Sequence, residues 1–187
     1  ESKWLGQNSA ANYHPSATMS DSTPFPAQPY SPIAISMGDV CGIGPEIIAQ
    51  AFAQQPDLLC GGCVIGDAAV LRRATQQLGL PLQIVDCTEP QAALSAEKNQ
   101  ILIMKPAFQA EKSAWTAIDS EALLALPIGQ ISATAGAFAA ACVRTGAALA
   151  LRGKVAALVT APLHKEALAA AGEPYPGHTE LLQAEAA

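Results

Sequence analysis

Short apolar runs alternate with longer helical segments along most of this chain, and this alternation constrains the fold most. Residues 33–37 are apolar and end at Gly38, which is typical of a buried strand, and Pro45 then suits the first turn of a helix. Further strands are expected at 62–65, 82–85, 101–104 and 155–159, and further helices at 68–78, 132–152, 165–171 and from 178 onward. The secondary structure of residues 105–129 stays ambiguous. The pattern predicts βαβ units, a mainly parallel sheet and the α/β class.

The composition supports a globular chain and excludes several other classes. Hydrophobic residues make up 50% of the 187 residues and charged residues 14%, which is enough apolar material for a core and excludes a wholly disordered chain. Ten basic and sixteen acidic residues give a net charge of −6, which disfavours nucleic-acid binding. The longest apolar run, 133–151, is rich in alanine and glycine and carries Arg144 in its middle, so we expect a buried helix and no membrane partner.

The chain divides into a tail and a folded part. Residues 1–31 contain four prolines and no helical or strand period, which predicts a disordered N-terminal tail or leader, with Met19 as a candidate native start. Residues 32–187 carry the α/β pattern. The last residue, Ala187, falls inside an apparent helix. Five cysteines, an odd number, and the lack of a signal peptide favour a cytoplasmic location.

One cysteine pair has a spacing known from redox and zinc sites. Cys60 and Cys63 are separated by two glycines, but no second CxxC and no nearby histidine accompany them. We favour two small residues at a strand start, with a redox or zinc protein as the alternative.

The first segment that could carry chemistry is 38–46, GDVCGIGPE. Its glycines follow a buried strand and precede a helix, so backbone N–H groups could receive an anion. The spacing fits neither GxGxxG nor GxxxxGK[ST]. A tight turn that needs glycine is the alternative. Asp39 lies at the carboxyl end of a predicted parallel strand, where ligands usually bind, but it could equally cap the turn.

Two later segments hold most of the remaining candidates. Lys165 follows the predicted strand 155–159 and could bind an anion or assist proton transfer, or could simply be a solvated lysine; the neighbouring His164 is weaker. His178 and Thr179 open a helix after a rigid Pro/Gly loop and suit a phosphate or carboxylate ligand, or Thr179 is an N-cap beside a histidine. No GxSxG elbow supports a serine hydrolase, and these residues do not make a complete metal site.

Together these segments resemble the 4-hydroxythreonine-4-phosphate dehydrogenase family. The matching stretches are IAISMGDVCGIGPEII (33–48), GQISATAG (129–136) and VAALVTAPLHKEALAAAGEPYPGHTELL (155–182). The last is the most specific. Val40 and Cys41 stand where the family commonly has Pro-Ala.

The resemblance implies a fold and an activity. The fold would resemble isocitrate and isopropylmalate dehydrogenases, with two α/β domains in a homodimer. The activity would be oxidation, followed by decarboxylation, of 4-phosphooxy-L-threonine in pyridoxal 5'-phosphate (vitamin B6) biosynthesis. The cofactors would be NAD or NADP and a divalent metal such as Zn, Mg or Co. By position, His178 and Thr179 would bind substrate, and Asp39 and Lys165 would line the same cleft.

The resemblance also implies what this chain lacks. The family's metal-binding histidines follow the GHTE segment, and no histidine follows His178 here. We therefore expect residues 32–187 to be the N-terminal portion of the enzyme, without its second half, without metal ligands of its own and unable to oxidise substrate alone. The cofactor-binding residues are not identified. A family member acting on another phosphorylated hydroxy acid or a cis-dihydrodiol dicarboxylate is one alternative. An inactive fragment that binds small anions is another.

Overall fold

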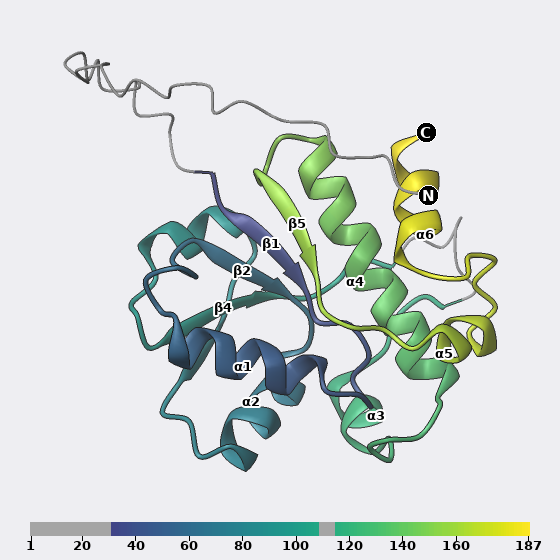
Figure 1. Cartoon of the computed structure of the whole chain (residues 1–187), viewed down its shortest axis with the longest axis horizontal. Helices are drawn as coiled ribbons and strands as arrows, with labels where there is room; N and C mark the ends of the chain where they lie inside the picture. The colour runs from purple at the N-terminus through teal and green to yellow at the C-terminus, as the bar shows by residue number, and fades with distance from the viewer. Residues whose placement is uncertain (1–30, 109–114) are drawn as a thin grey trace, which may run out of the picture.

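A five-stranded sheet forms the centre of the molecule. The computed structural model describes residues 31–108 and 115–187. Every strand pair is parallel, in the order β3-β4-β2-β1-β5 (Figure 1). The strands are β1 (Ile33–Ser36), β2 (Gly62–Ile65), β3 (Gln83–Asp86), β4 (Gln100–Met104) and β5 (Ala157–Thr160). The predicted α/β class and parallel sheet are confirmed.

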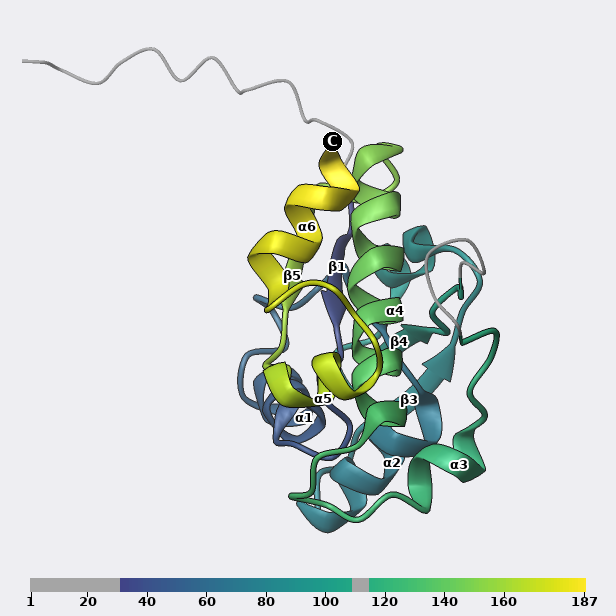
Figure 2. The ribbon, with the colours of Figure 1, turned by 90° about the vertical axis from the view of Figure 1, so that its right-hand side faces the viewer.

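Helices cover both faces of this sheet. α1 (Gly44–Gln54) and α2 (Ala68–Gln77) pack together on one face, and α4 (Ala133–Leu151) lies on the other (Figure 1). The 3-10 helix η1 (Pro90–Ser95) packs on β2 and β4. α5 (Lys165–Ala170) and α6 (His178–Ala186) lie against α4, farther from the sheet (Figure 2). The short α3 (Ser120–Leu124) contacts α2.

Local sequence signals explain where several helices begin. The Asp67 carboxylate accepts hydrogen bonds from the N–H groups of Ala69 and Val70, at 2.9 and 3.2 Å, and so caps α2. Ser132 caps α4 through the N–H of Ala135, at 3.4 Å. Pro45 occupies the first turn of α1.

Small residues let α4 approach its neighbours closely. A Cβ atom on Gly136 would lie 2.0 Å from the Ala167 carbonyl oxygen, and one on Gly146 would lie 2.5 Å from a methyl group of Leu158 on β5. Among the described residues α4 is the one helix long and apolar enough to span a membrane, yet most of that apolar stretch is buried inside the fold. Its composition is therefore that of a core helix, as predicted.

The structure differs from the sequence-based expectation mainly at element boundaries. β5 starts two residues later than predicted, because its partner β1 starts at Ile33 and the two strands pair from Ala157 onward. β3 is shifted by one residue. η1 was not predicted, since a 3-10 helix of six residues is too short to show an apolar period. α3 falls within the ambiguous stretch 105–129. The predicted tail, apart from Ser31, lies outside the described residues.

Candidate functional site

The loop between β1 and α1 is pressed against the loop that follows β5. Gly38 has φ of +74°, and a Cβ atom there would lie 2.2 Å from the Pro162 carbonyl oxygen. The Asp39 N–H donates to the same oxygen at 3.0 Å. Glycine is thus required at position 38 both by its backbone conformation and by the contact between the two loops.

Asp39 has a structural role in this loop. Its side chain is buried, with the residue 5% exposed, and Oδ1 accepts a hydrogen bond from the Cys41 N–H at 2.8 Å. This is the capping alternative considered above. The carboxylate is at the carboxyl end of β1, as predicted, but this oxygen is engaged by the turn itself.

Further backbone contacts hold the loop from both sides. The Arg73 guanidinium on α2 donates to the Val40 carbonyl at 3.1 Å. The Gly129 N–H donates to the Cys41 carbonyl at 2.7 Å. The loop is therefore held by four contacts: Arg73 on α2, Gly129, Pro162 and the turn within the loop itself.

Lys165 begins α5 just after β5 and is exposed. It lines an open depression of about 390 Å³ together with Glu166, Tyr175 and Pro176. His164, the weaker candidate, is also exposed and makes no side-chain cap to α5. Lys165 thus has space beside it for a solute, whereas His164 has no described part in the site.

His178 is held by the end of β5. The ring nitrogen Nε2 lies 3.2 Å from the Ala161 carbonyl oxygen. Because a carbonyl oxygen only accepts hydrogen bonds, Nε2 carries the proton in this contact, and Nδ1 of a neutral ring is then an acceptor. The N-cap of α6 is Gly177, with no side-chain cap, so the alternative in which Thr179 caps the helix is wrong. Thr179 is exposed in the first turn.

All three predicted segments meet at Ala161 and Pro162. Asp39 bonds to Pro162, His178 bonds to Ala161, and Lys165 approaches Gly177: a Cβ atom there would lie 3.5 Å from the lysine Cε. The adjacent carboxyl ends of β1 and β5 explain this convergence. Within 31–108 and 115–187, no group of three or more His, Cys, Asp and Glu side chains is placed to hold a metal ion.

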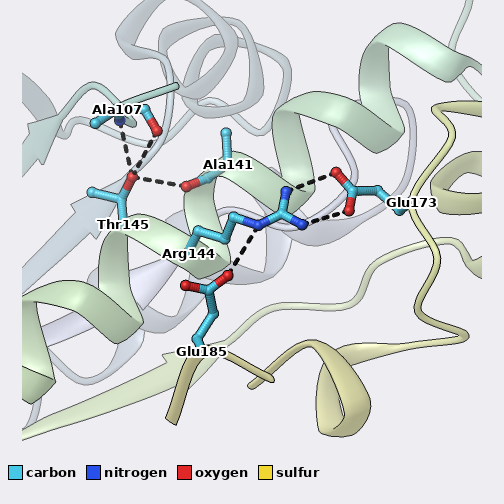
Figure 3. Close-up of polar contacts among 6 residues, drawn as sticks. All are labelled: Ala107, Ala141, Arg144, Thr145, Glu173 and Glu185. Atoms are coloured by element: carbon cyan, nitrogen blue, oxygen red, sulfur yellow. Dashed lines mark hydrogen bonds and ion pairs between the residues drawn. The ribbon is translucent and has the colours of Figure 1, made fainter. Parts of the chain in front are cut away.

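A buried ionic cluster fastens α6 and the preceding loop to α4. Arg144 donates two hydrogen bonds to Glu173, at 2.7 and 2.6 Å, and one to Glu185 at 3.2 Å (Figure 3). The three side chains are 4–7% exposed. The hydrogen bonds to Glu173 raise the pKa of the Arg144 guanidinium. In the sequence Arg144 stands out as a charge inside an apolar run, but no local pattern pairs it with these carboxylates.

The same helix makes a second buried polar contact. The Thr145 hydroxyl accepts a hydrogen bond from the Ala107 N–H at 2.9 Å and lies 2.8 Å from the Ala141 carbonyl oxygen, to which it donates (Figure 3). α4 therefore anchors the segment after β4 as well as the one before α6.

The sequence matches the family described as "Pyridoxal phosphate biosynthetic protein PdxA" over residues 59–187. It is 40% identical over 152 residues to the 4-hydroxythreonine-4-phosphate dehydrogenase of Beijerinckia indica, covering 81% of this chain and 40% of that protein. It is 42% identical over 153 residues to the D-threonate 4-phosphate dehydrogenase of Salmonella typhimurium, covering 80% and 42%. The chain thus spans about two fifths of the length of these relatives.

Solved structures are similar as well. The 4-hydroxythreonine-4-phosphate dehydrogenase of Klebsiella pneumoniae matches with a TM-score of 0.68 and 38% identity, over 83% of this chain and 44% of that one. A terephthalate 1,2-cis-dihydrodiol dehydrogenase from Burkholderia xenovorans matches with a TM-score of 0.54 and 29% identity, over 79% and 39%. The family match, the relatives and the fold agree, and the chain belongs to the PdxA family of pyridoxal phosphate biosynthetic proteins.

Proposed function

We propose that residues 32–187 supply the N-terminal portion of a nicotinamide-dependent dehydrogenase that oxidises a small phosphorylated hydroxy acid, 4-phosphooxy-L-threonine, in pyridoxal 5'-phosphate biosynthesis. The observation that carries the proposal is the meeting of the three segments at Ala161 and Pro162, where His178 contacts Ala161 and the Lys165 side chain lies near Gly177, the residue before His178. The relatives named as 4-hydroxythreonine-4-phosphate dehydrogenases support the reaction class.

His178 and Thr179 are the proposed substrate-binding residues. Both lie in the first turn of the nine-residue helix α6, whose N-terminus carries partial positive charge and backbone N–H groups without intrahelical partners. The contact with Ala161 fixes the plane of the imidazole ring, so His178 can present Nδ1 in one direction. The Lys165 ammonium adds a full positive charge nearby. This arrangement suits a phosphate or carboxylate group.

Asp39 takes a different proposed role. Its Oδ1 is bonded to the Cys41 N–H and its backbone N–H to Pro162, so we assign it to positioning the loop against the end of β5. Lys165 remains the candidate that lines the cleft.

Other parts of the proposal depend on the family. NAD or NADP would accept the hydride, and a divalent ion such as Zn, Mg or Co would polarise the substrate oxygen. The described residues do not fit a three-ligand metal site, so the chemistry of the ion is not assigned to them. A cytoplasmic homodimer is the proposed state of the whole enzyme.

D-threonate 4-phosphate is the second candidate substrate. The relative of that name in Salmonella typhimurium is 42% identical, against 40% for the first 4-hydroxythreonine-4-phosphate dehydrogenase. Both substrates are phosphorylated hydroxy acids, and the site features above suit either one.

A ligand titration monitored by melting temperature tests the proposal. The chain is titrated with 4-phosphooxy-L-threonine, D-threonate 4-phosphate and inorganic phosphate, and binding at a hundred times Kd stabilises by about 2.7 kcal/mol, or roughly 5–11 °C. We expect a shift with a phosphorylated acid that His178→Ala and Thr179→Ala abolish, whereas His164→Ala, which alters an exposed histidine outside the site, keeps it.

Three outcomes would contradict the proposal. One is the absence of any shift with both acids. Another is a shift that survives His178→Ala. The third is binding of inorganic phosphate as tight as that of the acids, which would favour a module that binds small anions.

A further inference from the structure

The loop that leads into α6 can form few backbone hydrogen bonds of its own. Four residues separate Glu173 from His178, and two of them, Pro174 and Pro176, have no N–H group to donate. Gly177, the N-cap of α6, adds no side-chain hydrogen bond. The position of this loop, and of the first turn of α6 after it, therefore depends largely on contacts with other elements.

Three side chains on one face of α6 attach this helix to the rest of the fold. His178, Leu181 and Glu185 follow one another at intervals of three and four residues, which places them along one side of a helix. The His178 ring contacts the Ala161 carbonyl, and Leu181 is buried among residues of α4 and α5. Glu185 accepts a hydrogen bond from Arg144. The three contacts together fix the direction of α6 and its rotation about its own axis.

Arg144 holds this segment at both of its ends. Its guanidinium donates two hydrogen bonds to Glu173, just before the loop, and one to Glu185, in the last turn of α6 (Figure 3). The side chain comes from the core helix α4 and is itself 5% exposed. A planar guanidinium can serve both carboxylates at once because its N–H donors point in fixed directions. One rigid group therefore fixes both the start of the loop and the far end of the helix.

The proposed substrate-binding groups lie between these two ends, in the first turn of α6. Thr179 follows His178 by one residue, so its exposed side chain is turned by about 100° from the attached face of the helix. The free Nδ1 of the His178 ring points away from Ala161, because the other ring nitrogen is held there. A binding group must be held to within about 0.5 Å to meet its ligand well. The attachment of α6 therefore decides where both groups point.

We propose that Arg144 is a positioning residue for the phosphorylated hydroxy acid. By holding Glu173 and Glu185, it sets the direction in which His178 and Thr179 meet the ligand. Arg144 is buried and does not touch the ligand itself. The inference rests on the proposed function, because it takes His178 and Thr179 as the substrate-binding residues.

Two measurements on Arg144→Lys test the proposal. Lysine keeps the positive charge but lacks the planar fork that donates to both oxygens of Glu173. The first measurement is nuclear magnetic resonance of the His178 ring without any ligand. A ring N–H held by a carbonyl exchanges slowly with water and gives its own signal, so we expect this signal in the wild type and its loss in the variant. His178→Ala assigns the signal.

The second measurement is the dissociation constant for 4-phosphooxy-L-threonine and for D-threonate 4-phosphate, taken by calorimetry well below the melting temperature, where each variant is folded. We expect Arg144→Lys to raise this constant about tenfold, which corresponds to one lost hydrogen bond. Thr145→Val is the matched control. It also removes buried hydrogen bonds from α4, but these anchor the segment after β4, so the ring signal and the dissociation constant should keep their wild-type values.

The fold of each variant is checked by circular dichroism. Glu173→Gln, which leaves Arg144 paired with Glu185, takes the place of Arg144→Lys if that variant does not fold, and it should lose the ring signal in the same way. The proposal is wrong if the wild type gives no ring signal, if the folded variant keeps the signal or the wild-type dissociation constant, or if Thr145→Val changes them as much. If the wild type binds neither acid, the proposed function fails, and the ring signal alone then decides whether Arg144 positions His178.

Discussion

Replacement of Arg144 by methionine should destabilise the fold strongly. Methionine keeps much of the side-chain length and apolar contact but removes the charge and all three hydrogen bonds to Glu173 and Glu185. The Glu173 carboxylate, which is 4% exposed, would then remain in the fold without its cation.

The magnitude follows from that burial. Removing one partner of a buried ion pair costs about 3–5 kcal/mol, a large part of the roughly 5–15 kcal/mol that stabilises a typical domain. For a chain of this size the melting temperature should fall by about 6–20 °C. Thermal unfolding followed by circular dichroism measures the shift. Arg152→Met, at the exposed end of the same helix, is the matched control and should change the stability by no more than about 0.5 kcal/mol.

A second variant separates the charge from the packing. Adding Glu173→Gln to Arg144→Met removes the stranded carboxylate and should recover part of the lost stability, so the free-energy changes of the two substitutions should not add. The reasoning fails if Arg144→Met loses less than about 1 kcal/mol, as an exposed ion pair would, or if the two substitutions are simply additive.

Three further predictions concern backbone contacts and a buried thiol. Gly38→Ala should lower the free energy of unfolding by more than the roughly 1–2 kcal/mol expected from positive φ alone, because its Cβ would meet the Pro162 oxygen. Urea unfolding measures this loss. Gly79→Ala, with φ of +64° and open space around it, is the control that isolates the φ effect. Gly136→Ala should force α4 and α5 apart, which would show as faster amide hydrogen exchange in α5 and is refuted by unchanged exchange. Burial raises the pKa of Cys142, so the folded chain keeps a proton that the unfolded chain releases above pH 9.0, and stability should fall as pH rises past that value. Cys142→Ala should make this decline shallower by up to about 1.4 kcal/mol per pH unit, and an unchanged slope contradicts the assignment.

Most of the secondary structure could be predicted because the signals are local. The apolar run ending at Gly38, the proline in the first turn of α1 and the long alanine-rich stretch of α4 each act within a few residues. The alternation of these elements predicts parallel pairing, since parallel strands need a crossover between them. The family motifs at 160–166 and 174–180 are continuous in the sequence, which is why the candidates Lys165, His178 and Thr179 could be named.

Tertiary structure decided which of these residues meet and what each one contacts. Arg144 joins Glu173 and Glu185, which are 29 and 41 positions away, because α5 and α6 pack on α4. Cys63 meets Cys87 because β2 and β3 flank β4 in the sheet, an order that no local pattern contains. Asp39 is a cap because the loop folds back on itself and on Pro162. The sequence alone determined the types and order of most of the elements, since these depend on neighbouring residues. The partners of buried polar side chains depend on contacts between distant segments, and those exist only in the folded chain.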